Sequence, residues 1–202
     1  LEDRFDTFSY SGDNDPLTGL YNRRQFLQML DMEFQRAKWE STDFCLAVFR
    51  LHNFEAICND YGHACGDHVL SAFGKLLMKV KRDSDLATRL KEGQFAVLMA
   101  DIGPNKAQAF LDKFIKTFTH LNFTCKQNKS FSVDVNTGMV HSKGNVNLRS
   151  KDLFSLAEKA ITQADQMGRN RIVVTRTRER KNFPKTTMVH SNEKQFLFTG
   201  AR

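Results

Sequence analysis

The sequence lacks the features that mark membrane-spanning and secreted chains. No apolar run approaches the roughly 18 residues that a membrane-spanning helix requires. The first residues show no signal-peptide pattern. The few cysteines, Cys45, Cys58, Cys65 and Cys125, have no C-x-x-C pairing and no histidine at metal-site spacing. We therefore expect free thiols in a reducing compartment, and a cytoplasmic domain.

Long blocks of like charge are also missing. The net charge of +7 permits an acidic or phosphate-bearing partner without requiring one, and we expect no direct nucleic-acid binding. The chain has 18 Phe but only one Trp and three Tyr, and this composition predicts a phenylalanine-rich core. With 202 residues, 41% hydrophobic and 26% charged, the chain suffices for one well-buried core plus a tail. Because it begins with Leu1, we expect a fragment of a longer protein, whose membrane association stays open.

Periodicity predicts an alternation of helices and strands. Phe26, Met29, Leu30 and Phe34 recur at helical spacing, and the continuous apolar run 44–51 predicts a strand in the centre of a sheet. The remaining predicted elements are two helices before residue 82, a hairpin over 89–99, a helix over 105–121, a strand over 131–140, a helix ending at Gly168 and a last strand at 172–175. This order predicts an α/β (α+β) domain with helices packed on a largely antiparallel sheet.

Four stretches together resemble one known family. DPLTGLYNRR (15–24), NDYGHACGDHVL (59–70), the hairpin at 89–99 and GRNRI (168–172) follow the order and spacing of the GGDEF domains, the diguanylate cyclases. The resemblance implies a mostly antiparallel five-stranded sheet flanked by helices, like a nucleotidyl-cyclase palm. It also implies a reaction that joins two GTP molecules into cyclic di-GMP with Mg²⁺.

The resemblance places other residues where the family holds metal and phosphate. The family's first-strand metal-binding Asp falls on Arg50, and a second Asp of that strand end falls on His52. Both carboxylates of the family's hairpin are replaced, by Gly93 and Gln94. Its phosphate-facing Lys falls on Asp165, so that charge is inverted. Mg²⁺ requires oxygen ligands, so we expect the Mg²⁺ site to be lost, with no cofactor and no enzymatic activity.

Glu92 is the carboxylate nearest to the missing pair in the sequence, but it lies one position early. Because a shift of one position reverses the face of a strand, a rescue of the site would need a slipped hairpin. We expect KEGQ (91–94) to be a solvent-facing turn in which Gly93 supplies a positive φ.

The residues of a vestigial nucleotide site are partly kept. The family's guanine-recognising Asn falls on Cys58, which lacks the paired hydrogen bonds of an amide. Asp67 matches the guanine-binding Asp, and Arg169 matches the family's Gly-Arg pair. Asp67 also fits a helix N-terminal charge. Arg50 has a second interpretation, in which it binds a nucleotide phosphate directly and the domain senses GTP without turnover.

A second motif matches the family's inhibitory site, where cyclic di-GMP binds. Arg82 and Asp85 form an Arg-x-x-Asp motif in the family's register before the hairpin, with Lys113 as a secondary contact. An Arg fork fits the O6 and N7 edge of guanine or a phosphate, and an Asp accepts from guanine N1 and N2. The same pair also fits a surface salt bridge worth about 0.3–0.5 kcal/mol, and Lys113 fits a solvated helix face.

These residues lead to one function hypothesis with alternatives. We expect a linker over 1–14, a degenerate GGDEF domain over 15–176 and a basic tail over 177–202. The domain is predicted to be a catalytically inactive receptor for cyclic di-GMP that signals to a protein partner or a neighbouring domain. The alternatives are an interaction or dimerisation domain that binds no nucleotide, with a homodimer left open, and a GTP-sensing domain.

Overall fold

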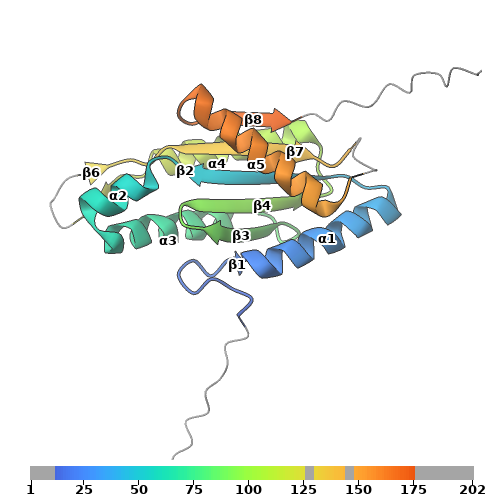
Figure 1. Ribbon diagram of the computed structural model, residues 1–202, viewed down its shortest axis with the longest axis horizontal. Coiled ribbons are helices and arrows are strands. Elements are labelled where there is room, and N and C mark those ends of the chain that lie inside the picture. The colour runs from blue at the N-terminus through green and yellow to red at the C-terminus, as the bar shows by residue number, and fades with distance from the viewer. Residues whose placement is uncertain (1–11, 126–129, 144–147, 176–202) are drawn as a thin grey trace, which may run out of the picture.

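A central sheet carries five helices in a computed structural model that describes residues 12–125, 130–143 and 148–175 (Figure 1). The sheet has the strand order β1-β3-β4-β2-β7-β8. Its strands are β1 (Tyr21–Asn22), β2 (Phe44–Leu51), β3 (Leu86–Lys91), β4 (Gln94–Ala100), β7 (Val135–His141) and β8 (Ile172–Thr175). The helices are α1 (Arg23–Glu40), α2 (Phe54–Tyr61), α3 (His63–Val80), α4 (Pro104–Thr119) and α5 (Ser150–Met167). The short strands β5 (Phe123–Thr124) and β6 (Ser130–Phe131) pair in a separate two-stranded sheet.

The predicted fold class is confirmed, with one more strand in the main sheet than expected. The apolar run 44–51 is the strand β2, which lies between β4 and β7 and pairs antiparallel with both. β3 and β4 form the predicted antiparallel hairpin, and β7 pairs parallel with β8. The added strand is β1, whose two residues pair parallel with β3 and are too few to show a periodic pattern.

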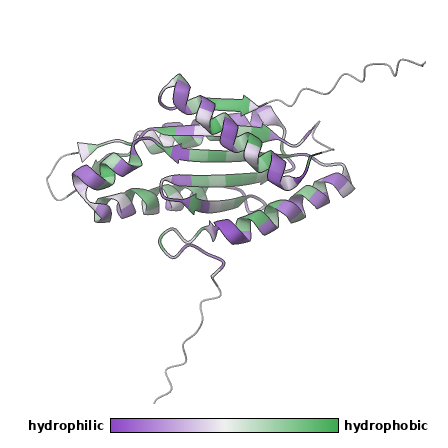
Figure 2. Cartoon of the chain, in the orientation of Figure 1, coloured by the Kyte–Doolittle hydropathy of each residue, from purple (hydrophilic) through white to green (hydrophobic). Residues whose placement is uncertain are grey.

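The two faces of the sheet are covered by different helices. Alternate β2 side chains point to opposite faces. Phe49 and its neighbours on one face pack against α2, α3 and α4, where Phe73 stacks on Phe95 at 4.2 Å between ring centroids. Phe44 and its neighbours on the other face pack against α1 and α5. Figure 2 shows the apolar strands inside and the mixed surfaces of the helices around them. The predicted phenylalanine-rich core is confirmed.

The first motif builds the turn that precedes α1. Asp15 accepts hydrogen bonds from the backbone N–H and the hydroxyl of Thr18, at 2.9 and 2.6 Å. Asn22 caps α1 by accepting from the Gln25 N–H at 2.9 Å. Asp15 also forms an ion pair with Arg89 of β3 at 3.0 Å. Residues 15–24 therefore join the start of α1 to strand β3 of the hairpin.

The prediction that all four cysteines are free thiols is wrong. Cys65 in the first turn of α3 forms a disulfide with Cys125, which follows β5. Cys45 and Cys58 are free thiols, as expected. The two bonded cysteines are 60 positions apart with 6.0 Å between their Cα atoms, and only the folded chain brings them together.

Two other expectations change at the ends of elements. The predicted strand 131–140 is interrupted, because Phe131 belongs to β6 and the sheet strand β7 begins at Val135. Most of the expected linker 1–14 and the whole expected tail 177–202 lie outside the described residues. Within the described ranges, no helix has the length and apolarity needed to cross a bilayer.

Candidate functional site

Three side chains form a row across the centre of the sheet where the family's metal site is expected. Arg50 near the end of β2 lies directly opposite Gln94 of β4 on one side and Asn136 of β7 on the other. Directly opposite residues of antiparallel strands project to the same face, which here is the face covered by α5. The row thus brings together Arg50 and Gln94, two positions at which the family resemblance implies metal-binding carboxylates.

Asp165 of α5 completes this row by binding two of its members. The Arg50 guanidinium donates through Nη1 to Asp165 Oδ2 in an ion pair. Asn136 donates through Nδ2 to Asp165 Oδ1 at 2.8 Å and to the Gly168 carbonyl at 2.9 Å, and it accepts from the Arg171 N–H at 3.0 Å. Asn136 is fully buried, whereas the Arg50 and Asp165 side chains are 36% and 30% exposed.

The sequence indicated two residues of this network but not the third. Arg50 and Asp165 were singled out separately, because each has the charge opposite to the one the resemblance implies at its position. Their ion pair shows that the two inverted charges neutralise each other. Asn136 was missed, because its signal depends on the register of β7 against β2.

The hairpin tip is only partly the solvent-facing turn that was predicted. Gly93 has the expected positive φ, +62°, and Lys91 and Glu92 are exposed. Gly93 and Gln94 are buried, with Gln94 only 3% exposed. A Cβ atom at position 93 would lie 2.9 Å from the Phe54 Cβ atom, too close for an ordinary contact. The backbone conformation and the packing of Phe54 therefore both oppose an acidic side chain at Gly93.

Cys58 of α2 lies in an acidic environment at the expected guanine position. Burial raises the pKa of the Cys58 thiol, and the negative charges of Glu92 and Asp67 raise it further. The hairpin turn thus brings Glu92 near Cys58 rather than into the Arg50 row. Asp67 is exposed on the second turn of α3. A protonated thiol beside two carboxylates is a poor replacement for a guanine-binding amide.

Arg169 forms its ion pair with a residue that is not part of the Arg50 row. It follows α5, its side chain is 66% exposed, and it pairs with Asp134 at 3.5 Å. It lines a shallow pocket together with His52 and the stacked rings of Tyr61 and Phe131, whose centroids are 4.3 Å apart.

Arg82 and Asp85 bind each other at the end of α3. Asp85 accepts from the Arg82 backbone N–H at 3.0 Å, from Nε at 3.2 Å and from Nη2 at 2.6 Å. Arg82 Nη2 also donates to the carbonyl of Ala100, the last residue of β4, at 2.7 Å. The hydrogen bonds to Asp85 raise the pKa of Arg82, so the guanidinium stays charged. The pair closes the turn between α3 and β3 and ties it to the end of β4.

The two members of this pair differ in exposure. The Asp85 side chain is only 2% exposed, whereas the Arg82 side chain is 46% exposed. Among the described residues, Arg82 Nη1 takes part in no hydrogen bond. Lys113 of α4 lines a pocket of about 130 Å³ with Val80, which is two residues before Arg82, and with Phe110, Phe114 and Thr117.

A second Arg-x-x-Asp motif has the same local geometry. Asp152 accepts from the Arg149 backbone N–H at 2.9 Å and from its Nε at 3.4 Å, at the start of α5. The Asp152 N–H donates back to the Arg149 carbonyl at 2.9 Å, as the Asp85 N–H does to the Arg82 carbonyl at 3.0 Å. The reciprocal bonds are therefore a general turn geometry. What distinguishes Arg82 is the buried Asp85 and the additional bond to Ala100.

Comparison with known proteins identifies the family. Residues 13–171 match the family described as "Diguanylate cyclase, GGDEF domain", and the chain belongs to this family. It is 28% identical over 164 residues to the probable diguanylate cyclase DgcT of Escherichia coli K12, covering 79% of this chain and 35% of that protein. It is 31% identical over 156 residues to the diguanylate cyclase DgcS of Shewanella oneidensis, covering 77% of this chain and 50% of that protein. The chain thus spans half or less of these two relatives.

The fold also matches solved GGDEF structures. The GGDEF domain of DgcB from Caulobacter crescentus, solved in complex with c-di-GMP, superimposes with a TM-score of 0.78 at 22% identity, covering 82% of this chain and 94% of that one. At this identity the likeness concerns the fold. It confirms that the helices and the mixed sheet are arranged as in GGDEF domains.

Proposed function

We propose that this chain is a catalytically inactive GGDEF domain that binds cyclic di-GMP through Arg82. The observation that carries the loss of catalysis is the ion pair of Arg50 with Asp165. A cyclase needs carboxylates to hold Mg²⁺ and a cation to hold phosphate. In this chain the metal-binding position holds the guanidinium of Arg50, and the phosphate-binding position holds the carboxylate of Asp165. The two groups form an ion pair with each other.

The residues of the Arg50 row do not fit Mg²⁺. Arg50 repels a cation, Gln94 has one neutral carbonyl oxygen, and Asp165 already accepts from Arg50 and Asn136. Among the described residues, no group of three or more His, Cys, Asp or Glu side chains is placed to hold a metal ion. The bond to Asp165 also argues against the GTP-sensing alternative, because a phosphate would have to displace that carboxylate from Arg50.

Binding of cyclic di-GMP is supported by the exposed part of Arg82. Its Nη1 group projects two N–H donors without a protein partner among the described residues. These donors can form charge-assisted hydrogen bonds to the O6 or N7 acceptor of guanine or to a phosphate oxygen. The DgcB domain, which is similar in fold, was solved with c-di-GMP. Lys113, on the pocket beside Val80, supplies a second positive charge.

Asp85 takes a different role from the one expected. Its carboxylate is buried and accepts three hydrogen bonds from Arg82, so direct contact with a ligand base would require that these bonds break. We assign it the positioning of Arg82. The same observation favours the second candidate, an interaction domain without nucleotide, in which the pair acts only as a structural turn like Arg149 and Asp152.

Calorimetric titration with cyclic di-GMP tests the proposal. We expect micromolar or tighter binding to the unaltered chain and a loss of at least about tenfold in Arg82→Ala, since the charge-assisted donors of the guanidinium are removed. The matched control is Arg149→Ala, which removes the same local turn contacts at a different place and should leave binding unchanged. Absence of heat with the unaltered chain would support the interaction domain instead.

Two further measurements separate the remaining alternatives. A parallel titration with GTP that shows binding lost in Arg50→Ala, with no response to cyclic di-GMP, would replace the proposal by GTP sensing. Incubation with GTP and Mg²⁺ or Mn²⁺ tests the loss of catalysis. Any cyclic di-GMP formed above a protein-free blank would show that the domain is an enzyme. The cytoplasmic location, the protein partner and the homodimer stay predictions.

A further inference from the structure

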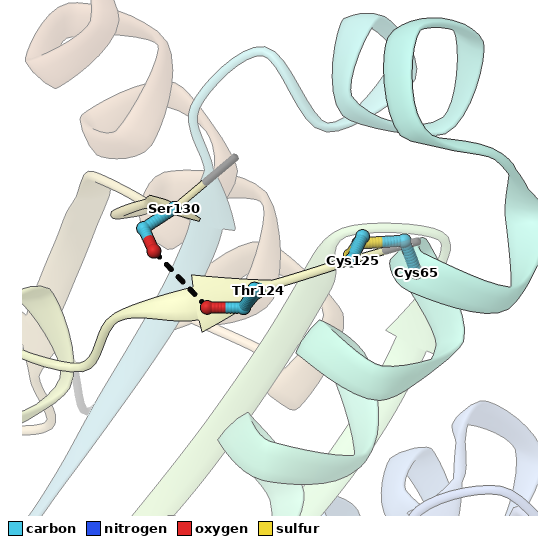
Figure 3. The surroundings of a disulfide bond; sticks show 4 residues. All are labelled: Cys65, Thr124, Cys125 and Ser130. Carbon is cyan, nitrogen blue, oxygen red and sulfur yellow. Dashed lines mark hydrogen bonds between the residues drawn. A yellow bond between two sulfur atoms is a disulfide. The ribbon is translucent and has the colours of Figure 1, made fainter. Parts of the chain in front are cut away.

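The disulfide joins helix α3 to the residue that follows strand β5. Figure 3 shows Cys65 on the helix and Cys125 at the end of the strand that carries Thr124. Cys65 is 5% exposed, while Cys125 is half-buried. The disulfide therefore fastens the β5–β6 pair to the start of α3. Of its two residues, only Cys125 has appreciable contact with solvent.

The β5–β6 pair has little hydrogen bonding of its own. Each strand has two residues, and the pair forms a separate sheet that is not hydrogen-bonded to the main one. Thr124 and Ser130 share one hydroxyl hydrogen bond of 3.0 Å at the surface, drawn in Figure 3. An isolated two-stranded pair is at best marginally stable in water. Apart from the disulfide, its position depends on the buried ring of Phe123 and on Phe131.

The same strand pair forms one side of the pocket that contains Arg169. Phe131, stacked on Tyr61, and the three residues after it line this pocket together with His52 and Arg169. A change in the position of β6 would therefore move one wall of the pocket. The disulfide connects this wall to α3, which also carries Asp67.

The other cysteines do not compete for this bond. Cys45 is buried in β2. Cys58 lies close to the residue after Cys65, since a Cβ atom built on Gly66 would be 2.5 Å from the Cys58 sulfur. Its raised pKa keeps the Cys58 thiol protonated at neutral pH, and a protonated thiol is a poor nucleophile. Exchange is thus directed to the half-buried Cys125.

We propose that Cys65 and Cys125 are a reversible redox modification site that fastens the β5–β6 strand pair in the oxidised state and releases it in the reduced state. In a reducing compartment, where this domain is predicted to lie, a disulfide is typically redox-sensing or transient rather than permanent. The oxidant is a small disulfide of the glutathione class. This inference does not depend on nucleotide binding.

The exchange proceeds in two balanced steps. The Cys125 thiolate attacks one sulfur of the oxidant, whose S–S bond breaks and releases one small thiolate, giving a mixed disulfide. The Cys65 thiolate then attacks the Cys125 sulfur and releases the second small thiolate. Two protein thiols lose two electrons and two protons in total, and the oxidant becomes two small thiols. Reduction follows the reverse path, starting at Cys125.

Redox titration of the full chain tests the chemistry. The protein is equilibrated in buffers with varied ratios of reduced to oxidised glutathione, acid-quenched and alkylated, and Cys65 and Cys125 are scored by peptide mass spectrometry. We expect both to change together from alkylated to disulfide-bonded within this series, while Cys45 and Cys58 stay thiols. A pair that stays reduced in oxidised glutathione alone, or that resists excess dithiothreitol, would overturn the proposal.

Amide hydrogen exchange tests the structural consequence. On reduction we expect exchange in peptides that contain Phe123, Thr124 and Phe131 to accelerate by at least about tenfold, because a local opening is no longer restrained. Peptides from β2 should not change. Cys125→Ser should show the fast exchange without reductant, and Cys58→Ser, the matched control, should behave like the unaltered chain. Equal exchange in the oxidised and reduced forms would overturn the switch.

Discussion

Reversing one charge of the Arg50–Asp165 pair should destabilise the fold, and reversing both should restore it. The variants are Arg50→Asp, Asp165→Lys and the double exchange. Each single variant places two like charges where the structure has an ion pair. The double variant recreates an ion pair with the polarity that the family resemblance implies.

The magnitude follows from the exposure of the pair. Two unit charges about 4 Å apart interact by about 4 kcal/mol at an effective dielectric near 20. The side chains of Arg50 and Asp165 are 36% and 30% exposed, so solvent screens much of this energy. We expect each single variant to lower the free energy of unfolding by about 1–3 kcal/mol, and a coupling of about 2 kcal/mol in the double-mutant cycle.

Urea denaturation followed by far-ultraviolet circular dichroism measures the cycle. Tryptophan fluorescence is the weaker probe, because Trp39 is already 88% exposed in the folded chain. The exposed Arg24–Asp13 pair is the control, and its charge reversal should show little coupling. The coupling at Arg50 and Asp165 should also decrease in about 0.5 M salt. Single-variant effects that simply add in the double variant would refute the ion pair as an energetic feature.

Three further predictions concern packing and titration. Gly138→Ala should lower the free energy of unfolding, measured by urea denaturation, by at least about 2 kcal/mol, because the new Cβ atom would lie 2.3 Å from the Ile161 backbone nitrogen. Gly103→Ala is the control, because a Cβ atom at Gly103 would have open space around it. Burial and the charge of Lys143 lower the pKa of His141, and the opposing effect of Asp43 is smaller than that of burial. The His141 imidazole therefore binds a proton more tightly in the unfolded chain than in the folded chain. The contribution of His141 to thermal stability should therefore be complete above pH 6.5, its ordinary pKa, and should be lost as the pH falls below that value. A His141→Gln variant whose melting temperature depends on pH as steeply as that of the unaltered chain would contradict this. Iodoacetamide should modify Cys58 slowly at neutral pH and faster as the pH rises, and the Glu92→Gln variant should be modified faster than the unaltered chain. Burial raises the pKa of Cys45 to about 12, so Cys45 should stay unmodified in the folded chain.

The regular part of the fold could be predicted because its signals are local. The apolar run of β2 and the helical spacing in α1 each report burial within a few residues of sequence. β1, β5 and β6 have two residues each, too few for any period to appear. The disulfide could not be predicted, because its partners meet only after α3 and β5 have packed.

The sequence singled out residues of the candidate site but not the contacts between them. Arg50 and Asp165 were noticed for their charges, but their bond depends on how α5 lies across the sheet. Asp85 was expected to face a ligand, and its burial depends on the turn that Arg82 closes with Ala100. Motif matching describes positions, whereas hydrogen-bond partners are decided by tertiary packing.

The central place of β2 has a consequence for how the chain is made. β2 is the earliest long strand to be synthesised, yet its partners β4 and β7 follow much later in the sequence. During synthesis, this apolar strand stays without its final neighbours until residues 135–141 have left the ribosome. Non-local pairing of this kind slows folding and leaves apolar segments open to aggregation. Production of the domain in cells should therefore benefit from slower translation or from chaperones that hold segment 44–51.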